Sequence, residues 1–167
     1  MRRVRLSCVA LATWAWAAAC NPVHNQAVAA LGGETPGVPK GPTHRAGEPC
    51  LTCHDGSLGD PSAFTVAGTI YIDADSKSAA VGAKILLTSI DGSSYTATTN
   101  SVGNFYVQSK QFTPNYPMSV TVTYEARPTT IMVSHVGRDG SCADCHTDPA
   151  GPSSAGHVFV PANGVTP

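Results

Sequence analysis

The chain has 167 residues and carries 10 basic and 11 acidic side chains, for a formal net charge of −1. Three of the basic residues lie within the first nineteen positions, so removal of that segment leaves seven basic and eleven acidic residues and a charge of −4. A protein that binds nucleic acid needs a basic surface, so this composition argues against nucleic acid as a partner.

The first nineteen residues have the pattern of an export signal. Arg2, Arg3 and Arg5 precede an apolar stretch that ends in three alanines at residues 17–19. A basic start, a short apolar run and small residues before the cleavage point are typical of a signal peptide. The run is too short to favour a membrane-spanning helix. We therefore predict a signal peptide over residues 1–19.

Cys20 follows the three alanines directly. This junction resembles a bacterial lipoprotein signal, in which the cysteine becomes the lipidated first residue, although Ala17 stands where such signals more often carry leucine. The alternative is an ordinary secretory signal. The resemblance implies that Cys20 is lipidated and held on a membrane. Residues 20–43 are rich in Gly, Pro, Ala and Thr and are predicted to be a flexible tether with at most a brief helical turn over 26–31.

The strongest chemical signal is a pattern that occurs twice: Cys50-Leu51-Thr52-Cys53-His54 and Cys142-Ala143-Asp144-Cys145-His146. C-x-x-C-H is the attachment signature of a c-type haem. Two thiols at this spacing can form thioethers with one porphyrin edge, and the following histidine then binds the iron as an axial ligand. We predict two covalently attached haem c groups. The residues that hold them are Cys50, Cys53, His54, Cys142, Cys145 and His146.

Three other uses of paired cysteines compete with haem. Zinc ribbons place their C-x-x-C pairs about 15–20 residues apart, whereas most of the chain separates these two. Local disulfides suit an oxidising compartment but leave both histidines without a role. A thioredoxin-like motif needs a surrounding βαβ pattern, and none is visible. The chain resembles dihaem c-type cytochromes, and the resemblance rests on the ten residues of the two motifs.

Between the motifs, residues 64–135 have the pattern of an all-β domain, with short β-branched and aromatic runs separated by turn residues. Asp91-Gly92 is a hairpin signal. The predicted strands cover residues 64–72, 83–90, 95–99, 103–109, 118–124 and 129–134. The first haem segment then covers residues 44–63. Residues 136–167 form the second haem segment, with a short closing strand near 157–160.

Residues 98–106, after the Gly68-Thr69-Ile70 strand and the Val81-Gly82-Ala83 turn, resemble the carboxypeptidase-regulatory or transthyretin-like β-sandwich. The resemblance implies a mainly β fold, with a single Ig-like or transthyretin-like β-sandwich flanked by two loop-rich haem-binding segments. Such domains are generally non-catalytic scaffolds, so the resemblance implies architecture rather than activity.

Each C-x-x-C-H supplies one iron ligand and leaves a sixth position open. His44 lies six residues before Cys50 and His135 lies seven before Cys142, so both haem segments read as a histidine, a short spacer and the motif. We predict His44 and His135 as metal ligands beside His54 and His146, in a degenerate repeat placed at both ends of the sandwich. Because the spacers are short for crossing a porphyrin, the two segments could also exchange ligands. The other candidates are His157, His24, Met118 and Met132.

Two histidines per iron imply a low reduction potential and no vacant position for a substrate. We therefore expect a membrane-tethered dihaem electron carrier outside the cytoplasm, on the periplasmic or cell-surface face of an outer membrane, that exchanges electrons with redox partner proteins. One alternative is a dihaem enzyme of the peroxidase or small-substrate reductase type with one open iron. Another is a β-sandwich binding module with structural haems.

Overall fold

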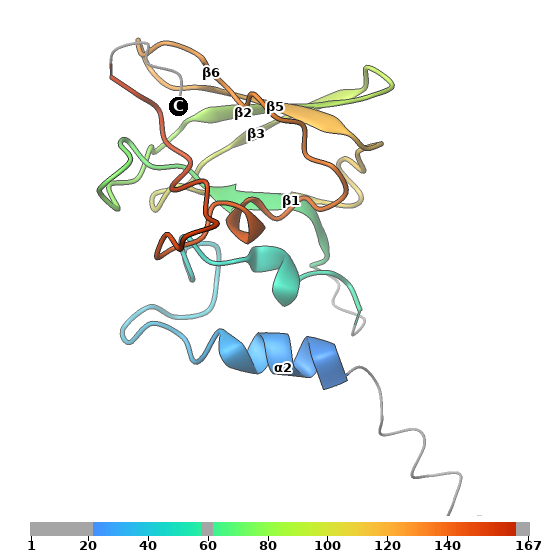
Figure 1. The fold of residues 1–167 in the computed structure, drawn as a ribbon, viewed down its shortest axis with the longest axis vertical. Coiled ribbons are helices and arrows are strands. Elements are labelled where there is room, and N and C mark those ends of the chain that lie inside the picture. The colour runs from blue at the N-terminus through green and yellow to red at the C-terminus, as the bar shows by residue number, and fades with distance from the viewer. Residues whose placement is uncertain (1–21, 58–61, 163–167) are drawn as a thin grey trace, which may run out of the picture. The chain divides into compact units, whose positions relative to one another are not determined.

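The structure is a computed structural model that describes residues 22–57 and 62–162, so the predicted signal peptide and Cys20 lie outside the described residues. The chain divides into two compact units, Met1–Gly32 and Gly33–Pro167. The described part of the first unit is mainly a nine-residue helix, α2 (Pro22–Ala30) (Figure 1). Its first residue is a proline, whose fixed φ suits the start of a helix. The observed helix begins before residue 26 and is longer than the helical turn predicted over 26–31.

Residues 33–43, which the sequence assigns to the tether, belong to the second unit. Among the described residues, no helix has the length and apolar character needed to cross a membrane.

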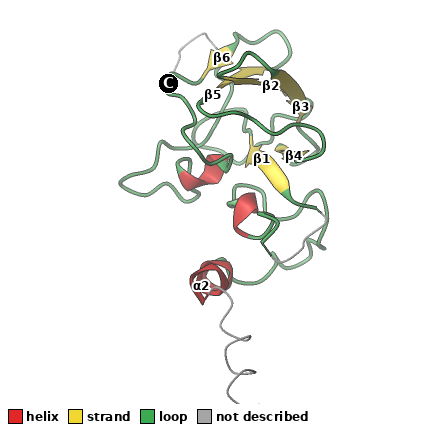
Figure 2. Cartoon of the chain, turned by 90° about the vertical axis from the view of Figure 1, so that its right-hand side faces the viewer, coloured by secondary structure: helices red, strands yellow, loops and turns green. Residues whose placement is uncertain are grey.

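The second unit is mainly β, as predicted, and its six described strands form two antiparallel sheets. A two-stranded sheet pairs β1 with β4, and a four-stranded sheet has the order β3-β2-β5-β6 (Figures 1 and 2). Each strand falls within a residue or so of its predicted range, except that the first and last are shorter than predicted. The strands are β1 (Phe64–Thr69), β2 (Lys84–Ser89), β3 (Ser94–Thr98), β4 (Asn104–Gln108), β5 (Met118–Thr123) and β6 (Thr130–Ile131).

The predicted hairpin joins β2 to β3. The Asp91 carboxylate accepts a hydrogen bond from the backbone N–H of Ser93 at 3.0 Å, and Gly92 has a φ of 84°. Along β2 the side chains alternate, with Ile85 and Leu87 fully buried. This period of two is what the β-branched and apolar pattern of the sequence predicts for a strand with one buried face.

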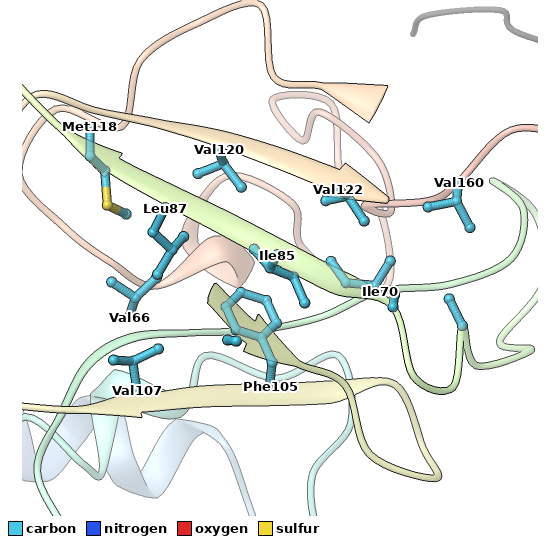
Figure 3. Packing of buried hydrophobic residues seen from close by; sticks show 13 residues of the cluster. Val66, Ile70, Ile85, Leu87, Phe105, Val107, Met118, Val120, Val122 and Val160 are labelled. Atoms are coloured by element: carbon cyan, nitrogen blue, oxygen red, sulfur yellow. The ribbon is translucent and has the colours of Figure 1, made fainter. Parts of the chain in front are cut away.

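One hydrophobic core lies between the two sheets (Figure 3). Phe105 and Val107 of β4 meet Ile85 and Leu87 of β2, and all four are at most 1% exposed. Full burial of such a side chain contributes about 1.5–3 kcal/mol. The same core receives Val160 from the far end of the chain, so the C-terminal segment packs back on the sheets as predicted.

The free edge of β1 is covered by the C-terminal segment. Ser141 forms a parallel bridge with Ala67, and the N–H of Ala67 donates to the carbonyl of Gly140 at 2.9 Å. Further along, Phe159 forms a parallel bridge with Tyr71. The segment that carries the second motif is therefore built onto β1 by backbone hydrogen bonds.

Candidate functional site

The two C-x-x-C-H motifs fold into the same backbone turn. Each begins a short 3₁₀ helix, η1 (Cys50–Thr52) and η2 (Cys142–Asp144). In each turn the N–H of the histidine donates to the carbonyl of the first cysteine, at 3.0 Å for His54 and 2.9 Å for His146. The first cysteine is partly shielded and the second is exposed in both. Two segments far apart in the sequence thus present their thiols and histidine from equivalent backbones.

Both turns lie next to β1 (Figures 1 and 2). The carbonyl of His54 accepts a hydrogen bond from the N–H of Phe64 at 2.8 Å, at the start of the strand. The second turn follows directly on Ser141, which pairs with the middle of the strand. The two segments that flank the β-domain in sequence therefore both lie beside one strand, because the C-terminal segment pairs with the strand that the first segment leads into.

At the first motif, the structure brings His44 and His54 together. Their ring centroids are 6.1 Å apart and the ring planes make an angle of 64°. With metal–nitrogen bonds of about 2 Å, two imidazoles that bind one ion from opposite sides have ring centres about 6 Å apart. The predicted pair therefore has a spacing that fits one iron between the two rings.

A carboxylate lies beside His44. Nδ1 of His44 is 3.3 Å from Oε2 of Glu34, which is within ion-pair distance, although the two groups are not aligned for a hydrogen bond. Metal-binding histidines usually direct their second ring nitrogen to a carboxylate or a carbonyl, which orients the ring. Burial alone would raise the pKa of Glu34, but Arg45 and His44 hold it below its ordinary value. Glu34 is therefore a carboxylate at neutral pH.

The ring of His54 is held in an aromatic stack. Phe64 lies parallel to it with centroids 4.5 Å apart, and Tyr106 stacks on the other side of Phe64 at 4.8 Å. Stacked pairs of this kind contribute about 0.5–1.5 kcal/mol beyond their buried area. The stack limits rotation of the His54 ring and so restrains the angle it makes with His44.

The second motif lies on the wall of a cavity of about 590 Å³. This volume is within the range of cofactor sites, about 300–1,000 Å³. Core side chains that include Phe105 and Met118 form its apolar wall. Cys142, Cys145 and His146 line it together with the predicted ligand His135. The structure thus places the second pair of candidate ligands on the wall of one cavity.

His146 is oriented by the loop that follows it. Its Nδ1 is 2.7 Å from the carbonyl oxygen of Gly156, and the N–H of Ala155 donates to the carbonyl of Cys145 at 2.9 Å. A carbonyl can only accept, so Nδ1 carries the proton and Nε2 is the nitrogen left for a metal. This is the second-shell contact that metal-binding histidines usually make.

The reserve ligands have other roles. His157 also lines the cavity, but its Nε2 lies 3.4 Å from Oδ1 of Asp148 and its ring packs on Tyr71 at 4.5 Å. Met118 and Met132 line the cavity as well, and Met118 is 1% exposed within the core. His24 belongs to the first unit.

The first cysteine of each motif is a poor nucleophile. Burial raises the pKa of the Cys50 thiol to about 11 and that of the Cys142 thiol to about 12. Redox-active C-x-x-C cysteines have a lowered pKa, because the thiolate is the reactive form. The thioredoxin-like alternative therefore disagrees with the electrostatics. Within residues 22–57 and 62–162, no three His, Cys, Asp or Glu side chains gather into a metal-binding group, whereas a haem iron needs only two protein ligands.

Several supporting residues escape analysis of the sequence, including Glu34, Phe64 and Gly156. A signal existed only for Gly68 of β1, where an added Cβ would lie 2.7 Å from Cβ of Cys142, because glycine inside a strand often marks a close approach of another chain segment. Glu34, Phe64 and Gly156 act on residues elsewhere in the sequence or through a backbone carbonyl, and the residue type alone does not indicate such a role.

Comparison of the chain with protein-family models, with curated proteins and with solved structures found no match.

Proposed function

We propose that the protein is a dihaem c-type cytochrome that carries electrons outside the cytoplasm. One observation supports this most strongly. The C-x-x-C-H sequence occurs twice and folds twice into the same turn. A second histidine accompanies each motif: His44 lies beside His54, and His135 lines the same cavity as His146.

The residues fit two haems of different surroundings. His54 and His44 hold the first iron, with Cys50 and Cys53 as attachment points. His146 and His135 hold the second, attached through Cys142 and Cys145 in the 590 Å³ cavity. Zinc or disulfides would leave unexplained why a histidine follows each cysteine pair and why His146 is held with Nε2 available.

The bound haem supplies reversible one-electron chemistry at iron. The chain supplies the two thioether positions, the axial imidazoles and their hydrogen-bond partners. Two imidazoles favour a lower potential than a histidine–methionine pair. The apolar side chains on the wall of the second site would limit water near a bound haem, and limited solvent access is one way in which a protein adjusts a redox potential.

The two sheets that face one core support the assignment of an Ig-like or transthyretin-like sandwich as the scaffold. Export and a lipid anchor at Cys20 complete the proposal, and they place the protein on the periplasmic or outer face of an outer membrane. Anchoring has a direct test. Replacing Cys20 with Ser should move the protein from the membrane to the soluble fraction, because stable anchoring needs acyl chains. A wild-type protein that is already soluble would refute the anchor and leave the haem proposal intact.

The second candidate function is a dihaem enzyme. The cavity at the second motif is large, and His135 on its wall is exposed. The iron of the second site is therefore the one at which a small substrate could replace a protein ligand. The first pair offers no such opening, because His44 is half-buried and packed close to His54.

Spectroscopy of the purified protein separates the two functions. A carrier with four histidine ligands is low-spin at both irons in both oxidation states and binds CO poorly. His44→Ala and His135→Ala should each convert about half of the haem to a high-spin, CO-binding form. Stoichiometric CO binding to one haem of the wild type would instead favour the enzyme.

A further inference from the structure

We infer that Thr69 and Asn104 are the positioning residues of His44, because a buried chain of hydrogen bonds through these two side chains holds the loop of the first haem site against the β-domain. Asn104 belongs to the stretch 98–106, whose resemblance to a β-sandwich family implies architecture only. The inference rests on the proposed function and deepens it, since it gives this part of the scaffold a role at the first iron.

The first observation is the pairing of the two side chains across a sheet. Thr69 of β1 and Asn104 of β4 are direct partners in the antiparallel register. Side chains alternate along a strand, and Phe105 packs in the core, so Asn104 points to the opposite face of the sheet. Thr69 and Asn104 are nevertheless at most 6% exposed. This face is therefore covered as well, and the loop of residues 42–47 contributes to the cover.

The second observation is a continuous chain of hydrogen bonds between two points of this loop. The N–H of Gly47 donates to Oγ1 of Thr69 at 2.8 Å, and this hydroxyl donates to Oδ1 of Asn104 at 2.7 Å. Nδ2 of Asn104 donates to the carbonyl of His44 at 3.0 Å and, at 3.4 Å, to that of Pro42. Buried polar groups that are paired in this way fix one arrangement of their partners. The loop is thus held on both sides of the His44 ring.

The turn that precedes β4 fixes Asn104 in its turn. Oδ1 of Asn100 accepts hydrogen bonds from the N–H groups of Val102 at 3.0 Å and Asn104 at 3.1 Å. Nδ2 of Asn100 donates to the carbonyl of Pro42, which Asn104 also reaches. An asparagine suits both positions, because its amide combines an acceptor with two donors. The stretch 98–106 therefore contributes two amides that hold the same loop.

The backbone of the loop depends on such support. Arg45 has a φ of 50°, and a residue other than glycine persists in this left-handed region only where its surroundings determine it. His44 directly precedes Arg45, and its ring centroid lies 6.1 Å from that of His54, a separation that suits one iron. Loss of the hydrogen bonds would let the loop relax and would move the His44 ring relative to His54.

Hydrogen exchange at the Gly47 amide tests the chain of bonds in the exported full-length protein. Thr69→Val removes the acceptor of this amide and should speed its exchange about two- to tenfold, and Thr69→Ser should restore slow exchange. The matched control is Thr99→Val. Thr99 is 5% exposed, accepts from the N–H of Ala83 at 2.8 Å and donates to the carbonyl of Ala80. This control should lower the stability to a similar extent and leave Gly47 unchanged. Equal acceleration in both valine variants, or none in Thr69→Val, would overturn the chain.

The ferric EPR spectrum of the haem-loaded protein tests whether the chain positions a ligand. Thr69→Val and Asn104→Leu should each shift the low-spin signal of the first haem or convert part of it to a high-spin form. Thr69→Ser should return the signal to its wild-type position, and Thr99→Val should not change it. The second haem is the internal control, and the Thr69 variants decide alone if Asn104→Leu does not fold.

A wild-type signal of the first haem in Thr69→Val would overturn the positioning role and leave the dihaem carrier intact. Absence of haem from the exported wild type would instead refute the proposed function, and with it any role at an iron. The exchange rate of the Gly47 amide would then still decide whether the hydrogen-bond chain exists.

Discussion

The two proposed haem sites share a backbone turn and differ in what surrounds it. At the first, His44 is half-buried, lies 6.1 Å from His54 and has Glu34 beside it. At the second, His146 is fixed by Gly156, while the other candidate ligand, His135, is exposed on the wall of a 590 Å³ cavity. The first site thus holds its two candidate ligands close together, whereas the second is a cavity.

Comparison of the two sites shows which of their properties depend on the motif itself and which depend on other segments of the chain. The turn is largely local, because in both motifs the N–H of the histidine donates to the carbonyl of the first cysteine of the same five residues. The surroundings are set by other segments: the loop with Glu34 and the stack of Phe64 and Tyr106 for the first site, and the core and the C-terminal segment for the second. We therefore expect the first site to resist exogenous ligands and the second to depend on the core for stability.

Loss of one haem should show the largest contrast. Cys142→Ala with Cys145→Ala and Cys50→Ala with Cys53→Ala should each remove one haem, as measured by mass. The first of these variants should lose about 3 kcal/mol or more beyond the second in free energy of unfolding, because it leaves the large apolar cavity unfilled, an effect on the scale of a large core truncation. Equal losses in denaturant unfolding would show that the cavity is not filled by haem.

The next largest effect is expected when a side chain on the wall of the cavity is shortened. Met118 is 1% exposed and belongs to both the core and the wall, so Met118→Ala should cost about 2–5 kcal/mol. It should shift the potential of the second haem and not that of the first. Val133, which is 84% exposed on the same wall, gives the control: Val133→Ala should change the free energy of unfolding by about 0.5 kcal/mol at most. A shift at the first haem would contradict the separation of the two sites.

The aromatic stack gives the corresponding probe of the first site. Phe64→Leu should cost about 0.5–1.5 kcal/mol from the lost stacking, in addition to the smaller loss of buried area. The EPR signal of the first haem should change, because its anisotropy depends on the angle between the imidazole planes, 64° between His44 and His54. The second haem serves as the internal control. An unchanged first signal would show that the stack does not orient His54.

The smallest effect is expected at Tyr71, which lines the small cavity between the two segments. Burial, and next the charge of Asp148, raise the pKa of Tyr71 to about 12. An unfolded tyrosine ionises near pH 10, so this residue stabilises the fold below that pH and the contribution is lost as pH rises from about 10 to 12. Tyr71→Phe should remove that alkaline sensitivity.

At neutral pH the same variant should change the free energy of unfolding by less than about 1 kcal/mol, because Tyr71 Oη is buried without a hydrogen-bond partner among the described residues. Denaturant unfolding at neutral and alkaline pH measures both effects. Unchanged alkaline sensitivity in Tyr71→Phe would show that another group titrates there.

Much of the β-fold could be predicted from sequence, because the alternation in strands such as β2 and the Asp91-Gly92 turn are local signals. The two C-x-x-C-H motifs could also be identified from the sequence. The position of both motifs beside β1 could not be predicted, because it depends on the pairing of Ser141 with Ala67 across 74 positions of sequence. The partner of His44 was missed for the same reason, because Glu34 lies in a stretch that composition alone marks as a tether.

The central claim is that each C-x-x-C-H carries a covalent haem, and one measurement tests it most directly. The full chain is produced in a host that exports it and attaches haem, and then is denatured and analysed by intact and peptide mass spectrometry. We predict the polypeptide plus two haems, one on the peptide with Cys50 and Cys53 and one on the peptide with Cys142 and Cys145. A chain that carries no covalent haem, or that binds zinc in its place, would contradict the account.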